Sequence, residues 1–404
     1  MFYIADNKIF SLSDSKSVEI KSRVLEDYRY RLTETIKRNE WKTSGSGAHF
    51  TNAAKPEMNV EGALSSLRVS ISSLCEIDGE LVYTLGIDNV CGIYKHSEDS
   101  PTDGIMISDS NYRYNYISHK DGISVVSASF MGEAHIGIIK DGENGCQFLT
   151  EGTSRESYPS FSKTNRNTVL YSGAGLAVDP SLAEAREKMR EYNSMHFGQM
   201  GNVYIEGPFS IYSIDLNSYE LCELISDDSQ KYSYIKPFEA ADGYIYYIKR
   251  PYSMSANSGK SSIGDTLMAP FRLLGAVFGF LNFFTIRYSG KTLTKNAGNT
   301  KAKNMPEEKL FIDGNIFEAS KEIENNRKQG DKFPGAIPRS FELCRRLSAD
   351  GKEEVIKKGV IAYSVRDNGE IICSDGLHIL SLTEKNGKFE EELIIKEKSV
   401  SFIL

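Results

Sequence analysis

Short runs of alternating apolar and polar residues, separated by polar turns, recur along the whole chain. Alternation with a period of two is typical of a β-strand with one buried face, and Asp-Gly or Asn-Gly between two runs fits a tight hairpin turn. The units with this form are CEIDGELVYTL (75–85), YISHKDGISVVSASF (116–130), YIKPFEAADGYIYYIK (234–249) and YSVRDNGEIICS (363–374), and YPSFSKTNRNTVLYSG (158–173) repeats it around Asn-Arg-Asn. The pattern therefore predicts β-hairpins throughout the chain.

A further strand pattern follows several of these hairpins. IFSL (9–12), IYSI (211–214) and ILSL (379–382) alternate alike, each before a polar turn and another strand, and 340–358 predicts one more such pair. Self-similar units of four short strands are typical of propeller blades. Five units begin near residues 68, 113, 156, 232 and 360, and a sixth is split between FYIAD at the start and KSVSFIL at the end. We therefore predict an all-β fold, a six-bladed β-propeller closed by its N- and C-terminal strands, as a single domain over 1–404.

The unit at 156–173 resembles a known family. Tyr158-Pro159-Ser160-Phe161-Ser162, a polar turn and then Thr168-Val169-Leu170-Tyr171-Ser172 are similar to the repeat of TolB-type six-bladed propellers. The family's Pro-Asp-Gly is replaced by Lys163, Thr164 and Asn165, and Pro237-Phe238 with Asp242-Gly243 is a weaker copy. The resemblance implies a propeller that binds peptide or protein segments at a channel mouth. It transfers no catalytic residue, because folds host unrelated functions.

Four insertions are expected between the strands. Residues 22–60 carry Leu25, Tyr28, Leu32 and Ile36 at helical spacing, which predicts an amphipathic helix. Asp179-Pro180 begins a helix within 178–206, and Asn315 is expected to cap a helix at 316–328 within 315–337. The fourth insertion, 252–308, combines an apolar helix with a basic loop and interrupts the fifth blade.

The apolar run at 265–287 is long enough to span a bilayer. A single crossing would place strands of one blade on opposite sides of the membrane, and Pro270 would shorten or kink a spanning helix. Three interpretations stay open: packing on the propeller itself, docking of a partner protein or a second copy, and contact with a membrane surface. The candidate docking residues are Phe271, Leu274, Phe278, Leu281 and Phe284, and the basic flank is Lys260, Arg287, Lys291 and Lys295.

Composition narrows the class of protein. The net charge of −7 argues against a nucleic-acid partner, which requires a basic face. The six cysteines show no Cys-x-x-Cys pair, and MFYIADNKIFSL lacks the features of a signal peptide. We therefore expect a cytoplasmic protein with free thiols.

Sequence motifs identify no catalytic residue, metal ligand or cofactor. The six histidines are scattered without metal-binding spacing, and SGKSS (258–262) and SGKT (289–292) lack the first glycine of a phosphate-binding loop. We therefore predict a non-catalytic scaffold that binds a protein or peptide partner, with the apolar helix as a cap or docking surface. Two alternatives remain: a hydrolase or lyase acting on a small or saccharide-like ligand at the channel, and a peripheral membrane-associated propeller. The sequence does not indicate the oligomeric state.

Overall fold

A computed structural model describes residues 1–14, 16–43, 60–143, 145–178, 204–252, 309–347 and 351–404. The chain divides into two compact units. Unit 1 comprises Met1–Ser22, Arg68–Met254 and Glu308–Leu404, and unit 2 comprises Arg23–Leu67 and Ser255–Glu307. In unit 2, helices α1 (Arg23–Thr43) and α2 (Val60–Ser66) contact each other.

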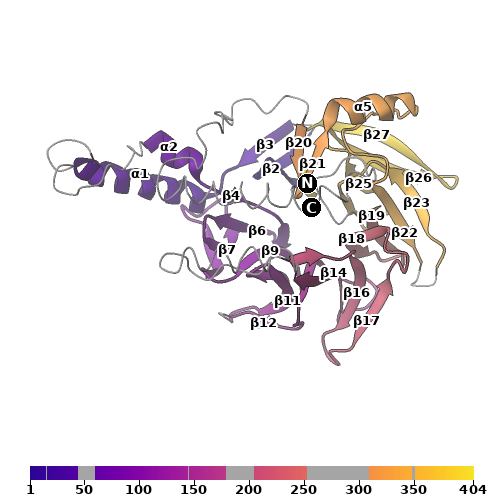
Figure 1. Ribbon diagram of the computed structural model, residues 1–404, viewed down its shortest axis with the longest axis horizontal. Helices are drawn as coiled ribbons and strands as arrows, with labels where there is room; N and C mark the ends of the chain where they lie inside the picture. The colour runs from indigo at the N-terminus through magenta and orange to yellow at the C-terminus, as the bar shows by residue number, and fades with distance from the viewer. Residues whose placement is uncertain (15, 44–59, 144, 179–203, 253–308, 348–350) are drawn as a thin grey trace. The chain divides into compact units, whose positions relative to one another are not determined.

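Unit 1 is built from β-sheets that follow one another in chain order around a common centre, the arrangement of a propeller (Figure 1). The first sheet contains β28 (Val400–Ile403), β1 (Phe2–Ala5), β2 (Lys8–Ser13) and β3 (Lys16–Ile20). The second contains β4 (Val69–Ser70), β5 (Leu74–Ile77), β6 (Glu80–Ile87), β7 (Val90–His96) and β8 (Gly104–Asp109).

The third sheet has nine strands. Its first part contains β9 (Arg113–Lys120), β10 (Ile123–Phe130), β11 (Glu133–Lys140) and β12 (Gln147–Phe148). Its second part contains β13 (Ser154–Phe161), β14 (Thr168–Val178), β15 (Tyr204–Glu206), β16 (Ser210–Asp215) and β17 (Leu221–Ile225). The two parts meet where β11 and β13 run parallel at the pair Ala134 and Arg155, whereas the other pairs in this sheet are antiparallel.

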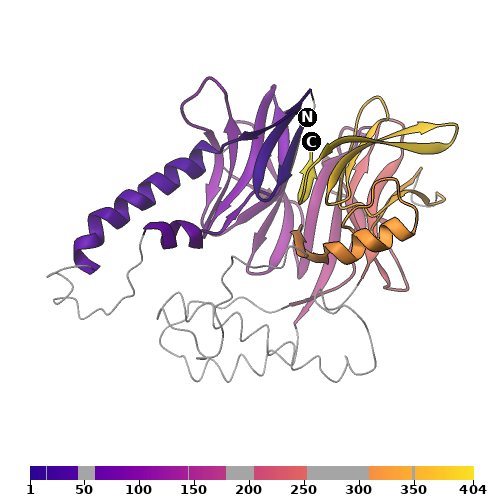
Figure 2. The same ribbon diagram turned by 90° about the horizontal axis from the view of Figure 1, so that it is seen from above.

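Two further four-stranded sheets complete the series. One contains β18 (Tyr232–Glu239), β19 (Ile245–Pro251), β22 (Glu342–Arg346) and β23 (Glu354–Lys358). The other contains β24 (Ala362–Val365), β25 (Ile371–Ser374), β26 (His378–Lys385) and β27 (Lys388–Lys396). Between β19 and β22 the chain forms a separate hairpin of β20 (Lys309–Ile312) and β21 (Asn315–Glu318), followed by helix α5 (Ala319–Lys328). Figure 2 shows α5, in orange, beside the yellow strands of the last sheet.

The first and last strands lie side by side, as both views show (Figures 1 and 2). Tyr3 is opposite Ile403 and Ile4 is opposite Phe402 in an antiparallel ladder. The amide of Leu404 also donates to the carbonyl of Phe2 at 2.9 Å. The strand predicted from KSVSFIL therefore pairs with the strand predicted from FYIAD.

The Asp-Gly turns form as the sequence predicts. Asp78 and Gly79 have φ values of 52° and 78°, and Asp121 and Gly122 have 50° and 78°. Positive φ at both central residues defines the tight turn whose twist matches the flanking strands, and Asp and Gly tolerate it best. The same geometry recurs at the tip of the β20–β21 hairpin.

The core lies between the faces of adjacent sheets, as binary patterning requires. One cluster joins the first and last sheets through Tyr3, Ile372, Ile379 and Val400, all buried. Many buried tyrosines keep a polar contact for the hydroxyl: Tyr3 donates to Glu397 and Tyr247 to Glu353, both at 2.8 Å. Many of the chain's aromatic residues therefore lie in the core.

The helix predicted at 316–328 begins later than expected. Residues Asn315–Glu318 form β21 and pair with β20 from Lys309 to Ile312, so α5 starts at Ala319. Asn315 is therefore not the cap: the cap position is Glu318, which makes no side-chain capping bond. The Asp-Gly turn at 313–314 directs this segment into a hairpin.

No helix among the described residues combines the length and apolarity that a membrane crossing requires. The apolar run at 265–287 lies outside those residues.

Candidate functional site

Several strands from different parts of the chain contact one another near the centre of unit 1. Strand β13 contacts β9 and β18, and β24 contacts β28. The ammonium of Lys236 on β18 donates to the carbonyls of Ile361 and Ser401, each at 3.0 Å. The hydroxyl of Tyr363 on β24 donates to the carbonyl of Lys236 at 2.5 Å. We call the region in which β9, β13, β18, β24 and β28 meet the axis.

Two equivalent bulges place side chains near the axis. Tyr158 precedes Pro159 in β13 and Lys236 precedes Pro237 in β18, with φ values of 57° and 58°. The ladder register shifts at both places, between Ser157 and Ser160 and between Ile235 and Phe238. A left-handed backbone is costly for a bulky residue, above all before proline, and persists only where its surroundings hold it. β-Bulges often redirect a side chain in this way.

Both redirected side chains contact Asp313 at the tip of the β20–β21 hairpin. One carboxylate oxygen, Oδ2, accepts from the Tyr158 hydroxyl and lies beside the Lys236 ammonium, both at 3.0 Å. The other, Oδ1, accepts from the Tyr116 hydroxyl on β9 at 3.2 Å. We call Tyr116, Tyr158, Lys236 and Asp313 the axial cluster. The side chains of Asp313 and Lys236 are only 14% and 12% exposed, so this is an ion pair largely removed from solvent.

The electrostatics of the cluster favour the charged carboxylate. Burial opposes ionisation of Asp313, but the charge and hydrogen bond of Lys236, the Tyr158 hydroxyl and the charge of Arg250 outweigh it, and the pKa is lowered. Burial and the nearby carboxylate raise the pKa values of Tyr116 and Tyr158, so both remain hydroxyl donors. The two tyrosine rings pack at 4.2 Å between centroids.

The hairpin tip has a further tie to the blade beside it. Asn315 donates to the carbonyl of Asp313 at 2.8 Å and accepts from Arg250 at 3.3 Å. The backbone of the tip is therefore held in addition to its carboxylate.

Sequence reasoning missed the axial cluster. The signals were present, since Tyr158-Pro159 and Lys236-Pro237 lie in the repeat copies and Asp313-Gly314 is a turn pair. Nothing local indicates that these segments meet. The predicted docking residues Phe271, Leu274, Phe278, Leu281 and Phe284, and the flank Lys260, Arg287, Lys291 and Lys295, lie outside the described residues.

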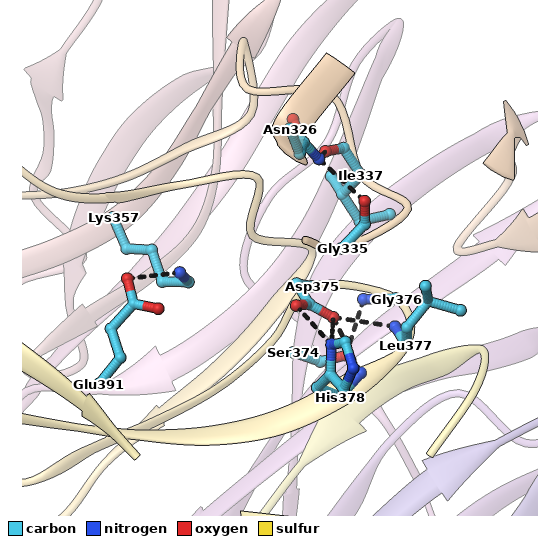
Figure 3. Close-up of polar contacts among 10 residues, drawn as sticks. All are labelled: Asn326, Gly335, Ile337, Lys357, Ser374, Asp375, Gly376, Leu377, His378 and Glu391. Atoms are coloured by element: carbon cyan, nitrogen blue, oxygen red, sulfur yellow. Dashed lines mark hydrogen bonds and ion pairs between the residues drawn. The ribbon is translucent and has the colours of Figure 1, made fainter. Parts of the chain in front are cut away.

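A second polar cluster lies at the turn between β25 and β26 (Figure 3). The Asp375 carboxylate accepts from the amides of Leu377 and His378 at 2.9 and 2.8 Å and from the His378 ring Nδ1 at 2.9 Å. Its backbone carbonyl accepts from the amides of Ala336 and Ile337. All of these contacts hold loops in place, so we assign a structural role to the cluster around Asp375.

Figure 3 also shows two contacts near this turn. Asn326 of α5 donates to the carbonyls of Gly335 and Ile337, at 2.8 and 3.0 Å, and so ties the helix to the loop that follows it. The ammonium of Lys357 on β23 donates to Glu391 on β27 at 2.6 Å, which joins the last two sheets. Lys357 is 8% exposed.

Several histidines and thiols of the described residues have a partner or are buried. His96 is beside Asp103, and His119 is beside Ser124, at 2.9 and 3.0 Å. Burial raises the pKa of Cys75 and of Cys146 to about 12, which leaves both thiols protonated at neutral pH. No group of three or more potential metal ligands occurs within the part of the chain that the structure describes. His49 and His196 lie outside it.

The chain resembles known proteins in its structure. No protein-family model matches the sequence, and no curated protein matches it. Among solved structures, TolB from Acinetobacter baumannii is similar, with 10% identity and a TM-score of 0.44, over 83% of this chain and 58% of that one. A putative TolB from Agrobacterium tumefaciens has 11% identity and a TM-score of 0.42, over 82% of this chain and 83% of that one.

Peptidases are also among the similar structures. The tricorn protease has 9% identity and a TM-score of 0.39, over 98% of this chain and 33% of that one. TolB structures are thus found, as the repeat at 158–173 predicts. The strand pairing of this chain defines its fold independently of these likenesses.

Proposed function

We propose that this chain is a six-bladed propeller, closed by pairing of β1 with β28, that acts as a non-catalytic scaffold for a protein or peptide partner. The blade number follows if the nine-stranded sheet is counted as two units divided between β11 and β13. Each unit then begins near a residue where the sequence predicts a blade. The ladder between β1 and β28 supports closure.

One observation carries the proposal for a scaffold. The axis, where a propeller enzyme would assemble reactive groups, holds a hairpin of the chain itself. Its carboxylate is neutralised by Lys236 and bonded by two tyrosines. Groups that satisfy one another in this way rigidify a fold, whereas catalysis requires groups free to meet a substrate.

The partner is proposed to bind through the insertion at 252–308. The aromatic stripe from Phe271 to Phe284 supplies apolar area, and the lysines and Arg287 beside it make this segment basic within an acidic chain. Such a segment fits a partner with an apolar groove bordered by acidic residues.

The experiment replaces 255–305 with a short Gly-Ser linker and compares it with the full chain in pull-downs and liposome flotation. We expect the full chain to retain a protein that the variant loses, with neither protein floating. A matched pair separates the contributions: F271S/F278S removes apolar contacts, whereas K260Q/R287Q/K291Q/K295Q removes charge. Flotation of the full chain alone would favour the membrane alternative, and identical behaviour of all variants would refute docking through the insertion.

A further inference from the structure

We propose that Tyr116, Tyr158 and Lys236 form a carboxylate-binding site that Asp313 occupies from within the chain. The Asp313 turn would thereby exclude an acidic turn of the partner protein from the axis. This inference rests on the proposed scaffold function and names the chemistry of the partner segment that the axis would accept.

The site is complementary to a carboxylate. Its donors come from β9, β13 and β18, and together they contact both oxygens of the Asp313 side chain. Hydrogen bonds in which a carboxylate accepts from an ammonium are among the strongest in proteins. A neutral amide in the same place could still bond the two tyrosine hydroxyls, which can accept as well as donate, but it would leave the Lys236 ammonium without a counter-charge, so the site favours Asp over Asn.

The cation is positioned by contacts other than Asp313. The Lys236 ammonium also donates to the carbonyls of Ile361 and Ser401. The backbone of Lys236 is fixed by the bulge and accepts from the Tyr363 hydroxyl. Loss of the Asp313 carboxylate would therefore leave a charged, oriented and mostly buried ammonium, and such a group requires an anion to replace it.

The occupant is tethered. Ile312 and Phe317 are buried in the core on one face of the hairpin, whereas Phe311 and Ile316 are 59% and 49% exposed on the other. A tethered carboxylate has a high effective concentration at the site. A partner must compete with it. The apparent affinity of the full chain is the affinity of the empty site multiplied by the fraction of molecules whose site is empty, and that fraction is small.

The test uses the full chain with Asp313→Gly, which removes the carboxylate and tolerates the positive φ of this position. The first probe is formate, compared with chloride at equal ionic strength. We expect formate to raise the Tm of D313G by about 2 °C or more, with no rise for the native chain or for D313G/K236M. An equal effect of formate on all three proteins would overturn the inference.

The second probe is acetate, which matches the removed Asp313 side chain in size, compared with acetamide, which matches the side chain of Asn. We expect acetate to raise the Tm of D313G by about 2 °C or more and acetamide to leave it unchanged. If D313G folds only in the presence of formate or acetate, that recovery supports the inference. Failure to fold with either anion, or equal shifts with acetate and acetamide, overturns it.

The two proposals fail separately. Capture of a partner by the native chain, with no formate effect on D313G, would refute the carboxylate site and leave the scaffold function in place. A formate effect on D313G without any captured partner would support the carboxylate site and refute the scaffold function.

Discussion

Asp375 and Asp313 are both largely buried, and their carboxylates are satisfied in opposite ways. The side chain of Asp375 is 3% exposed and is bonded within three residues of itself, to two backbone amides and to His378. The side chain of Asp313 is 14% exposed and is bonded by Tyr158 and Tyr116, 155 and 197 positions away. The first carboxylate stabilises one turn, whereas the second joins three inner strands. Substitutions at the two sites should therefore differ in how much unfolding free energy they remove and in how many parts of the fold they affect.

The largest effect is expected for Lys236→Met. It leaves the Asp313 carboxylate buried without its cation, and loss of one partner of a buried pair costs about 3–5 kcal/mol of unfolding free energy. Urea denaturation would measure it. The double variant K236M/D313N should recover part of the loss, because no unpaired charge remains. A loss below about 1 kcal/mol would mean that the axis admits enough water to solvate the carboxylate.

Asp375→Ala should have a smaller effect. It leaves the amides of Leu377 and His378 without an acceptor, which costs roughly 2–3 kcal/mol in a buried setting. Asp375→Asn keeps an acceptor oxygen in the same place and should remain within about 1 kcal/mol of the native chain. Equal losses in the two variants would indicate that the charge, and not the turn geometry, is what matters.

Gly335→Ala tests the packing around Asp375. A Cβ at Gly335 would lie 2.4 Å from the Asp375 Cβ and 2.6 Å from its carbonyl oxygen, so the loop or the turn must move. Overpacking of this kind costs about 1–2 kcal/mol. Gly104→Ala is the matched control, because its Cβ would meet only ordinary contacts at 3.8 Å. Thermal unfolding of both variants gives the comparison, and equal shifts would contradict the predicted clash.

The contribution of Asp313 should depend on pH. Its pKa is lower in the folded chain than the value of about 3.9 expected when unfolded, so its stabilising effect is complete above about pH 4 and declines as the pH falls through the folded value. The difference in stability between the native chain and D313N should therefore shrink between pH 7 and pH 3. Denaturation curves at both values would show this, and a constant difference would contradict the lowered pKa.

The smallest pH effect is expected at His135. The carboxylates of Glu156 and Glu133, 3.8 and 3.9 Å away, raise the pKa of His135. A raised value means that its stabilising contribution is present below about pH 6.5 and is lost as the pH rises through the folded value. His135→Gln should therefore destabilise the chain by less at pH 8 than at pH 6, measured by urea denaturation, whereas equal losses would contradict the shift.

The sequence predicts the local features of this fold well. Asp-Gly turns and alternating strands depend on neighbouring residues, and the structure has them where they are expected. The predicted start of α5 was wrong because Asn315 fits both a helix cap and a hairpin strand, and pairing with β20 decides between them.

The axial cluster could not be predicted from local pattern. Its four members come from β9, β13, β18 and a hairpin inserted between β19 and β22. Their proximity is produced by the way successive sheets surround a centre, which no single segment encodes. Asp375 is the contrasting case, since every acceptor and donor of its side-chain contacts lies within Ser-Asp-Gly-Leu-His (374–378).

The axial carboxylate also has a consequence for how the molecule unfolds. Repeat architectures in which each unit contacts only its neighbours can lose structure one unit at a time. Asp313 connects β9 of the nine-stranded sheet with β18 of the following sheet. Fraying of either sheet therefore disturbs the other. A molecule assembled from similar sheets is expected to melt as one cooperative body, with the hairpin tip as a link between strands that are distant in the sequence.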